Sequence, residues 1–107
     1  MRIKICQECC ETVEKDATIW VGWRGKEKVG SVTYREAENC LPFVYDLISD
    51  PRYPEVVAML TKRVERELKA KGYERCVFTI KQDSPALIQL VLSGRYRIEE
   101  IIASKEL

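Results

Sequence analysis

Apolar and polar residues follow one another along the chain in patterns that predict strands at its start and in its first half. Residues 2–6 alternate charged and apolar side chains, which indicates a short strand. The runs 18–23 and 29–34 are rich in β-branched and aromatic residues and flank the polar stretch RGKEK, so they predict a hairpin in which Gly25 supplies the turn geometry. Residues 41–49, LPFVYDLIS, are nearly all apolar and predict a strand buried on both faces, as in a helix-covered sheet.

A helix is predicted over residues 54–71. Pro54 suits its first turn, and Gly72 fits the position just after its end. Opposite charges four residues apart lie on its polar side, as in Arg63 and Glu67. Its apolar positions recur at helical spacing and are Val56, Val57, Met59, Leu60, Val64 and Leu68.

The remaining segments complete a mixed α/β (α+β) domain. Residues 7–16 are polar and weakly patterned, which indicates a loop or a single helical turn. Residues 76–80 predict a buried strand, 84–94 a helix begun by Ser84 and Pro85, and 96–103 a last strand. The expected order is β-β-β-β-α-β-α-β, a mixed sheet of about six strands with helices on its faces, in one domain over residues 1–107.

Composition narrows the possible partners. Of the 107 residues, 18 are lysine or arginine and 17 are acidic, so a net charge of +1 gives no electrostatic reason to expect nucleic acid or a membrane surface as a partner. No apolar run approaches the roughly 20 residues of a membrane span, and the N-terminus lacks the apolar segment of a signal peptide. We therefore expect a cytoplasmic protein.

The cysteines raise the question of a metal. Three of the five lie in CQECC, residues 6–10, and the others are Cys40 and Cys76. A structural zinc site usually takes four ligands, often as two such pairs, and this chain has one pair and no histidine. The odd number and irregular spacing also fit no disulfide framework. We expect reduced thiols, no metal, and Cys76 as a small apolar residue in a buried strand.

Four stretches, taken in order, resemble the GNAT (GCN5-related N-acyltransferase) superfamily. KVGSVTY resembles the strand that closes the family's first hairpin, and ISDPRY resembles the turn before its cofactor-binding helix. ELKAKGYERCVFTI resembles the end of that helix and the next strand, and DSPALIQLVLSGRY resembles the following helix. The resemblance covers roughly residues 17–103 and implies the GNAT fold.

The resemblance also implies a function, the transfer of an acyl group from acetyl-CoA or another acyl-CoA to an amine. In the family the donor lies where two central parallel strands separate, and a glycine-rich loop at a helix start holds its pyrophosphate. That loop corresponds here to residues 52–58. The implied catalytic bases are Asp46 and Glu55. The implied cofactor-binding residues are Arg52, Val57, Ala58, Leu47 and Ile48.

The chain departs from the family pattern at several of these positions. Glu55 and Val57 replace the two loop glycines, Pro54 lacks an N–H donor, and Leu90 stands where the family has a tyrosine that protonates the leaving thiolate. A GNAT-fold module that has lost catalysis and serves as an interaction domain is therefore the alternative.

The resemblance bears on partners as well. Gln7 to Asp16 replace two helices of the family, which implies an open acceptor side suited to a protein or peptide amine. An uncovered sheet edge predicts a homodimer, with the last strand and the tryptophans of the hairpin, Trp20 and Trp23, as contacts.

Overall fold

The computed structural model describes residues 2–8, 17–36 and 38–79. They form strands β1 (Ile3–Glu8), β2 (Ala17–Arg24), β3 (Glu27–Arg35) and β4 (Phe43–Ser49), helix α1 (Glu55–Ala70) and the short strand β5 (Val77–Phe78). The expected helix at 84–94 and strand at 96–103 lie outside the described residues. The observed order agrees with the prediction as far as it goes, with β1 extending two residues into the segment expected to be a loop.

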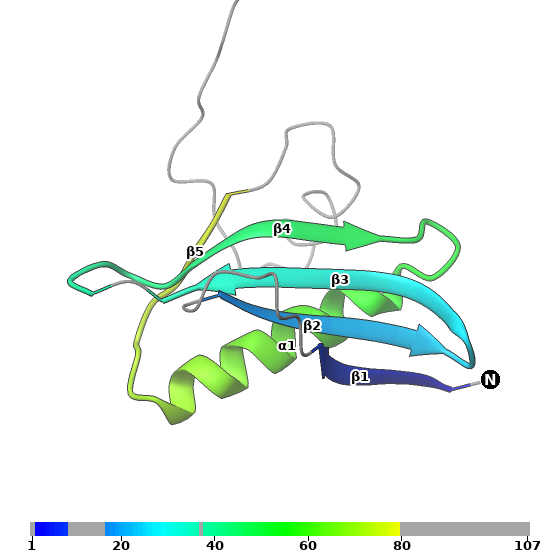
Figure 1. Ribbon diagram of the computed structural model, residues 1–107, viewed down its shortest axis with the longest axis horizontal. Helices are drawn as coiled ribbons and strands as arrows, with labels where there is room; N and C mark the ends of the chain where they lie inside the picture. The colour runs from blue at the N-terminus through cyan, green and yellow to red at the C-terminus, as the bar shows by residue number, and fades with distance from the viewer. Residues whose placement is uncertain (1, 9–16, 37, 80–107) are drawn as a thin grey trace, which may run out of the picture.

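The described strands form one five-stranded sheet in the order β1-β2-β3-β4-β5 (Figure 1). The first four strands are antiparallel to their neighbours, and β5 is parallel to β4. Helix α1 makes the connection between β4 and β5, which is the β-α-β arrangement that the sequence predicts. The hairpin between β2 and β3 turns at Gly25, whose φ of 64° lies in the left-handed region that glycine adopts readily.

Helix α1 lies along one face of the sheet (Figure 1) and buries the apolar stripe that its spacing predicts. Val56, Leu60 and Val64 are fully buried, and Trp20 of β2 is 6% exposed on the same core, so this tryptophan offers little surface for the dimer contact that the sequence predicts. The Arg63 guanidinium lies 4.4 Å from the centre of the Trp20 ring and closes the edge of this core. Each fully buried aliphatic side chain contributes roughly 1.5–3 kcal/mol, so this stripe accounts for the position of the helix.

Two glycines let α1 approach the sheet closely. Gly22 of β2 and Gly30 of β3 are register partners beneath the first turns of the helix. A Cβ atom on Gly22 would lie 2.7 Å from Cγ2 of Val56, and one on Gly30 would lie 3.0 Å from the main-chain oxygen of Ile48 and 3.1 Å from Cγ1 of Val56. A side chain at either position would clash with Val56 of the helix, and at Gly30 it would also crowd the main chain of β4.

The end of α1 follows the Schellman pattern. The N–H of Gly72 donates to the carbonyl of Lys69 and the N–H of Tyr73 donates to the carbonyl of Leu68. Gly72 has a φ of 95°, so the prediction that it stands just after the helix is confirmed. Tyr73 packs against the core. This cap directs the chain back toward β5, which sets that strand beside β4.

Strand β4 differs from the prediction on one face. Val44 and Leu47 point into the core, but Tyr45 and Ile48 are 43% and 57% exposed, so the expectation of burial on both faces is wrong. The reason is that α1 covers one face of β4, and among the described elements no second helix covers the other.

Candidate functional site

The sheet changes its pairing in the middle of β4. Thr33 pairs with Asp46 and Tyr34 pairs with Val44, so Tyr45 is an extra residue, a β-bulge, on this strand. On its other side, β4 pairs with β5 through Phe43 and Val44. The described part of β5 ends at Phe78, opposite Val44. The last bond of this pairing runs from the N–H of Thr79 to the carbonyl of Val44, at 2.7 Å.

The main chain of β4 beyond the bulge therefore faces an edge with no described strand beside it. Because Val44 bonds to the β5 side, the pair Tyr34–Val44 is of the type that exchanges no bonds within its own ladder. Pairs with and without hydrogen bonds alternate along antiparallel strands. Val32–Leu47 and Gly30–Ser49 are therefore also pairs without hydrogen bonds between β3 and β4. The N–H and C=O groups of Leu47 and Ser49 accordingly point to the β5 side, where an extended ligand could pair with them.

The implied site residues on β4 divide between the two faces. The side chain of Leu47 is 8% exposed and belongs to the core, so Leu47 can offer a ligand its main chain alone. Asp46 and Ile48 are both exposed. Asp46 directly follows the bulge, where an acid could take a proton from an amine at the strand edge.

The start of α1 offers few unpaired N–H groups to an anion. The N–H of Arg52 donates to Oδ1 of Asp50 at 3.0 Å, and that of Tyr53 donates to the Asp50 carbonyl at 2.9 Å. The N–H groups of Val56 and Val57 donate to the carbonyls of Tyr53 and Pro54, and Pro54 itself has no N–H. Most donors that could cradle a phosphate are thus already satisfied within the turn.

The other implied ligands at this turn are spread over different environments. Val57 is 2% exposed and its side chain packs in the core, whereas Ala58 is exposed on the first turn of the helix. Glu55 is exposed as the first residue of α1, where its carboxylate favours the helix dipole. The structure therefore does not gather these three side chains around one ligand.

Arg52 is exposed but bound to two carboxylates. Its Nε lies 3.1 Å and its terminal nitrogen 2.7 Å from Oδ2 of Asp50, and the same terminal nitrogen also bonds to Glu27, the first residue of β3. The hydrogen bonds that Arg52 donates to Asp50 and Glu27 raise the pKa of Arg52. The bonds to Asp50 also hold the pKa of the Asp50 carboxyl below its ordinary value of 3.8. The charge that the resemblance assigns to pyrophosphate is neutralised here by the protein.

Arg24, Tyr53 and Glu27, which the sequence did not link to the site, hold this turn in place. The guanidinium groups of Arg24 and Arg52 lie 5.0 and 5.3 Å from the centre of the Tyr53 ring. The sequence Asp50-Pro51-Arg52 carries a signal for the local part, since an aspartate often accepts a bond from the N–H two residues on. No comparable local signal exists for Glu27, which lies 25 residues before Arg52.

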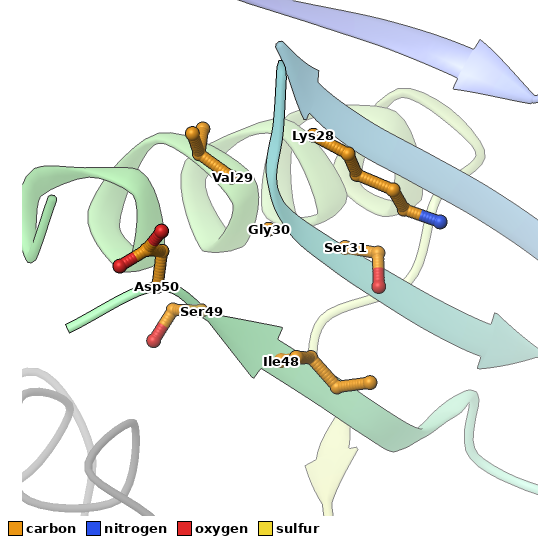
Figure 2. A pocket seen from close by; sticks show the side chains of 7 residues that line it. All are labelled: Lys28, Val29, Gly30, Ser31, Ile48, Ser49 and Asp50. Atoms are coloured by element: carbon orange, nitrogen blue, oxygen red, sulfur yellow. The ribbon is translucent and has the colours of Figure 1, made fainter. Parts of the chain in front are cut away.

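A hollow of about 300 Å³ opens beside the end of β4 (Figure 2). Strand β3 contributes Lys28, Gly30 and Ser31, and the end of β4 contributes Ile48 and Ser49. Asp50 also lines this hollow, so the carboxylate that binds Arg52 stands between the hollow and the start of α1. Its lining mixes apolar with polar groups.

The described residues show neither a metal-ligand cluster around the cysteines nor a helix that could span a membrane. Cys6 and Cys40 are exposed thiols, Cys76 is half-buried, and burial raises the pKa of Cys76. Cys9 and Cys10 lie outside the described residues, and in the described part no three side chains of metal-ligating type gather. Within residues 2–8, 17–36 and 38–79, no helix has the length and apolar character to cross a membrane.

Comparison with known proteins adds a fold likeness without a sequence match. No protein-family model matches the chain, and no curated protein sequence matches it. Among solved structures, it is similar to an aminoglycoside acetyltransferase from an uncultured soil metagenomic sample, in complex with sisomicin. That match has a TM-score of 0.65 and 16% identity, and it covers 88% of this chain and 66% of the other.

Two other solved structures show the same likeness. A putative acetyl transferase from Pyrococcus furiosus matches with a TM-score of 0.63 and 17% identity over 88% of this chain and 68% of its own. AAC(6')-Iy, solved in complex with the bisubstrate analogue CoA-S-monomethyl-acetylneamine, matches with a TM-score of 0.63 and 12% identity over 88% and 71%. The chain thus spans about two thirds of the length of such structures, and its fold is that of the GNAT acetyltransferases.

Proposed function

We propose that this protein is an acyl-CoA-dependent N-acyltransferase that acts on a protein or peptide amine. The observation that carries the proposal is the break in the sheet at Tyr45, where the bulge and the end of the described β4–β5 pairing leave the main chain of Leu47 and Ser49 with no partner strand among the described residues. An extended ligand that contains amides can bind such an edge as an added strand does. The pantetheine arm of an acyl-CoA has this form and ends in the thioester.

The proposed chemistry follows from the position of Asp46. An amine nitrogen attacks the thioester carbonyl, the C–S bond breaks, an amide forms, and the thiolate leaves and takes up a proton. Asp46 directly follows the bulge and is exposed, so its carboxylate can accept the proton that the amine loses, directly or through a water. Glu55 lies at the start of α1, where its charge would face a diphosphate, so we assign the base role to Asp46.

The acceptor is inferred from the open side of the fold. The neighbours named above include aminoglycoside acetyltransferases, which act on small molecules. In this chain β1 ends at Glu8 and β2 begins at Ala17, so residues 9–16 are too few to form two helices above the strands. A connection this short suits an acceptor amine on an extended peptide better than a small enclosed amine.

The test is a transfer assay with several acceptors. The protein is incubated with acetyl-CoA and either a set of lysine-containing peptides or sisomicin, and acetylated products are measured by mass spectrometry. We expect peptide acetylation that falls about a hundredfold in Asp46→Asn, within the range for loss of a general base. The control Glu38→Gln removes an exposed acid in the connection between β3 and β4 and should leave the rate unchanged. Absence of transfer to every acceptor would contradict the proposal.

The second candidate is a catalytically inactive, homodimeric GNAT-fold interaction module. Two observations favour it: Arg52 is neutralised by its own neighbours, and large apolar side chains are exposed on adjoining strands, with Ile48 at 57% and Val77 at 40%. A second copy of the chain would cover these side chains. Light scattering that gives twice the 12.4 kDa chain mass, together with no binding of acetyl-CoA, would favour this function over the enzyme.

A further inference from the structure

We propose that the donor site reads the pantetheine arm of its acyl thioester and does not read the nucleotide, so that acyl-pantetheine serves as well as acyl-CoA. This inference rests on the proposed function and specifies the chemical class of its donor. Two features of the turn before α1 act against binding of a diphosphate, and a third feature, on β4, favours a neutral ligand.

The first feature is the set of main-chain donors. A diphosphate at a helix start is held by N–H groups that have no partner inside the protein. Here the N–H groups of Arg52 and Tyr53 are bound to Asp50, and those of Val56 and Val57 are bound within the first turn. A diphosphate would have to displace these bonds, and it would recover none at Pro54.

The second feature is the charge at the turn. The Asp50 carboxylate takes three contacts from the Arg52 side chain, and Glu27 takes another from the opposite side. Glu55 adds a third carboxylate at the first residue of the helix. Arg24 and Arg52 both lie over the Tyr53 ring, and Arg52 is already paired with Asp50 and Glu27.

The third feature is that the edge of β4 requires no charge from its ligand. The main-chain groups of Leu47 and Ser49, which pair with no described strand on the β5 side, are neutral amides and match the neutral amides of a pantetheine arm. Donor recognition can therefore be completed within β4 without contact between the nucleotide and α1. Glu27 and Asp50 act as specificity-determining residues, because they keep Arg52 from a diphosphate.

The experiment compares S-acetylpantetheine with acetyl-CoA on the intact protein. Dissociation constants are measured by calorimetry, and transfer to the best peptide is measured for each donor. We expect the two dissociation constants and the two values of kcat/KM to agree within about fivefold. A preference for acetyl-CoA of a hundredfold or more would overturn the inference while leaving the acyltransferase proposal intact. Failure to bind or use either donor would overturn both.

Salt and charge variants provide an independent reading. We expect acetyl-CoA to bind no more weakly at 500 mM than at 50 mM salt, an expectation that uses screening lengths of about 14 and 4 Å; a tenfold weakening would contradict it. Glu27→Gln removes one charge beside Arg52 and should tighten acetyl-CoA about three- to tenfold, with no change for S-acetylpantetheine. The matched control Glu38→Gln should alter neither constant, and equal effects of the two variants would overturn the role of Glu27.

Discussion

The contact between Gly22 and Val56 allows a prediction in which two harmful substitutions partly cancel. Gly22→Ala places a methyl group 2.7 Å from Cγ2 of Val56, which is too close for two carbon atoms. The atom that it meets is the end of a side chain. Removing that side chain by Val56→Ala should therefore relieve the clash that the first substitution creates.

The magnitudes follow from packing. Overpacking by one methyl group costs about 1–3 kcal/mol, so we expect Gly22→Ala to destabilise the fold by about 2 kcal/mol. Val56 is fully buried, and Val56→Ala removes two carbon atoms at about 0.8 kcal/mol each and leaves a small cavity, for about 2 kcal/mol. Independent effects would sum to about 4 kcal/mol, whereas relief of the clash should leave the double variant near 2 kcal/mol.

Urea unfolding of the wild type, the two single variants and the double variant measures this coupling. With a slope of about 1.3 kcal/mol per molar urea, each kcal/mol moves the midpoint by about 0.8 M. We expect the midpoint of the double variant to lie close to those of the single variants. A double variant displaced by the full sum would refute the geometry.

The Gly30 position gives the matched control. A Cβ atom there lies 3.1 Å from Cγ1 of Val56, but it also lies 3.0 Å from the main-chain oxygen of Ile48, which no side-chain change can remove. Gly30→Ala combined with Val56→Ala should therefore recover less than half as much stability as the Gly22 pair. Equal recovery in the two pairs would show that α1 shifts as a body.

Two smaller predictions concern ionisable groups. Because burial raises the pKa of Cys76, we expect iodoacetamide at pH 8 to modify Cys76 at least about tenfold more slowly than the exposed Cys40, as measured by peptide mass spectrometry; equal rates would contradict the burial. The hydrogen bond from Lys71 to Glu36 raises the pKa of Lys71, so its stabilising effect is fully present below pH 10.5 and is lost as the pH rises through the folded-state value. The difference in Tm between the wild type and Lys71→Gln should therefore shrink from pH 8 to pH 12, and a constant difference would contradict the pair.

The parts of the fold that could be predicted are those set by local patterns. The helix at 54–71, its end at Gly72 and the hairpin around Gly25 follow from side-chain periodicity and from the conformations that glycine allows. The order of the described elements was predictable for the same reason. These features depend on residues that are close together in the chain, so the sequence alone contains the information that predicts them.

The features that decide the site depend on register and on distant side chains. The uniform run LPFVYDLIS carries no sign of a bulge at Tyr45, because the bulge results from how β4 pairs with β3. The pairing of Arg52 with Glu27 joins the turn before α1 to the start of β3, and the contact of Val56 with Gly22 joins a helix to a strand. Periodicity reports which residues are buried and is silent on which partner each one meets.

The central claim is that an acyl thioester lies along the edge of β4 beyond the bulge. The most direct measurement is a two-dimensional ¹⁵N–¹H NMR titration of the 12.4 kDa chain with S-acetylpantetheine. The account predicts saturable shifts of the amide signals of Leu47 and Ser49 and little change at Lys4 on β1. Shifts centred on residues remote from β4, or no saturable shift at millimolar ligand, would contradict it.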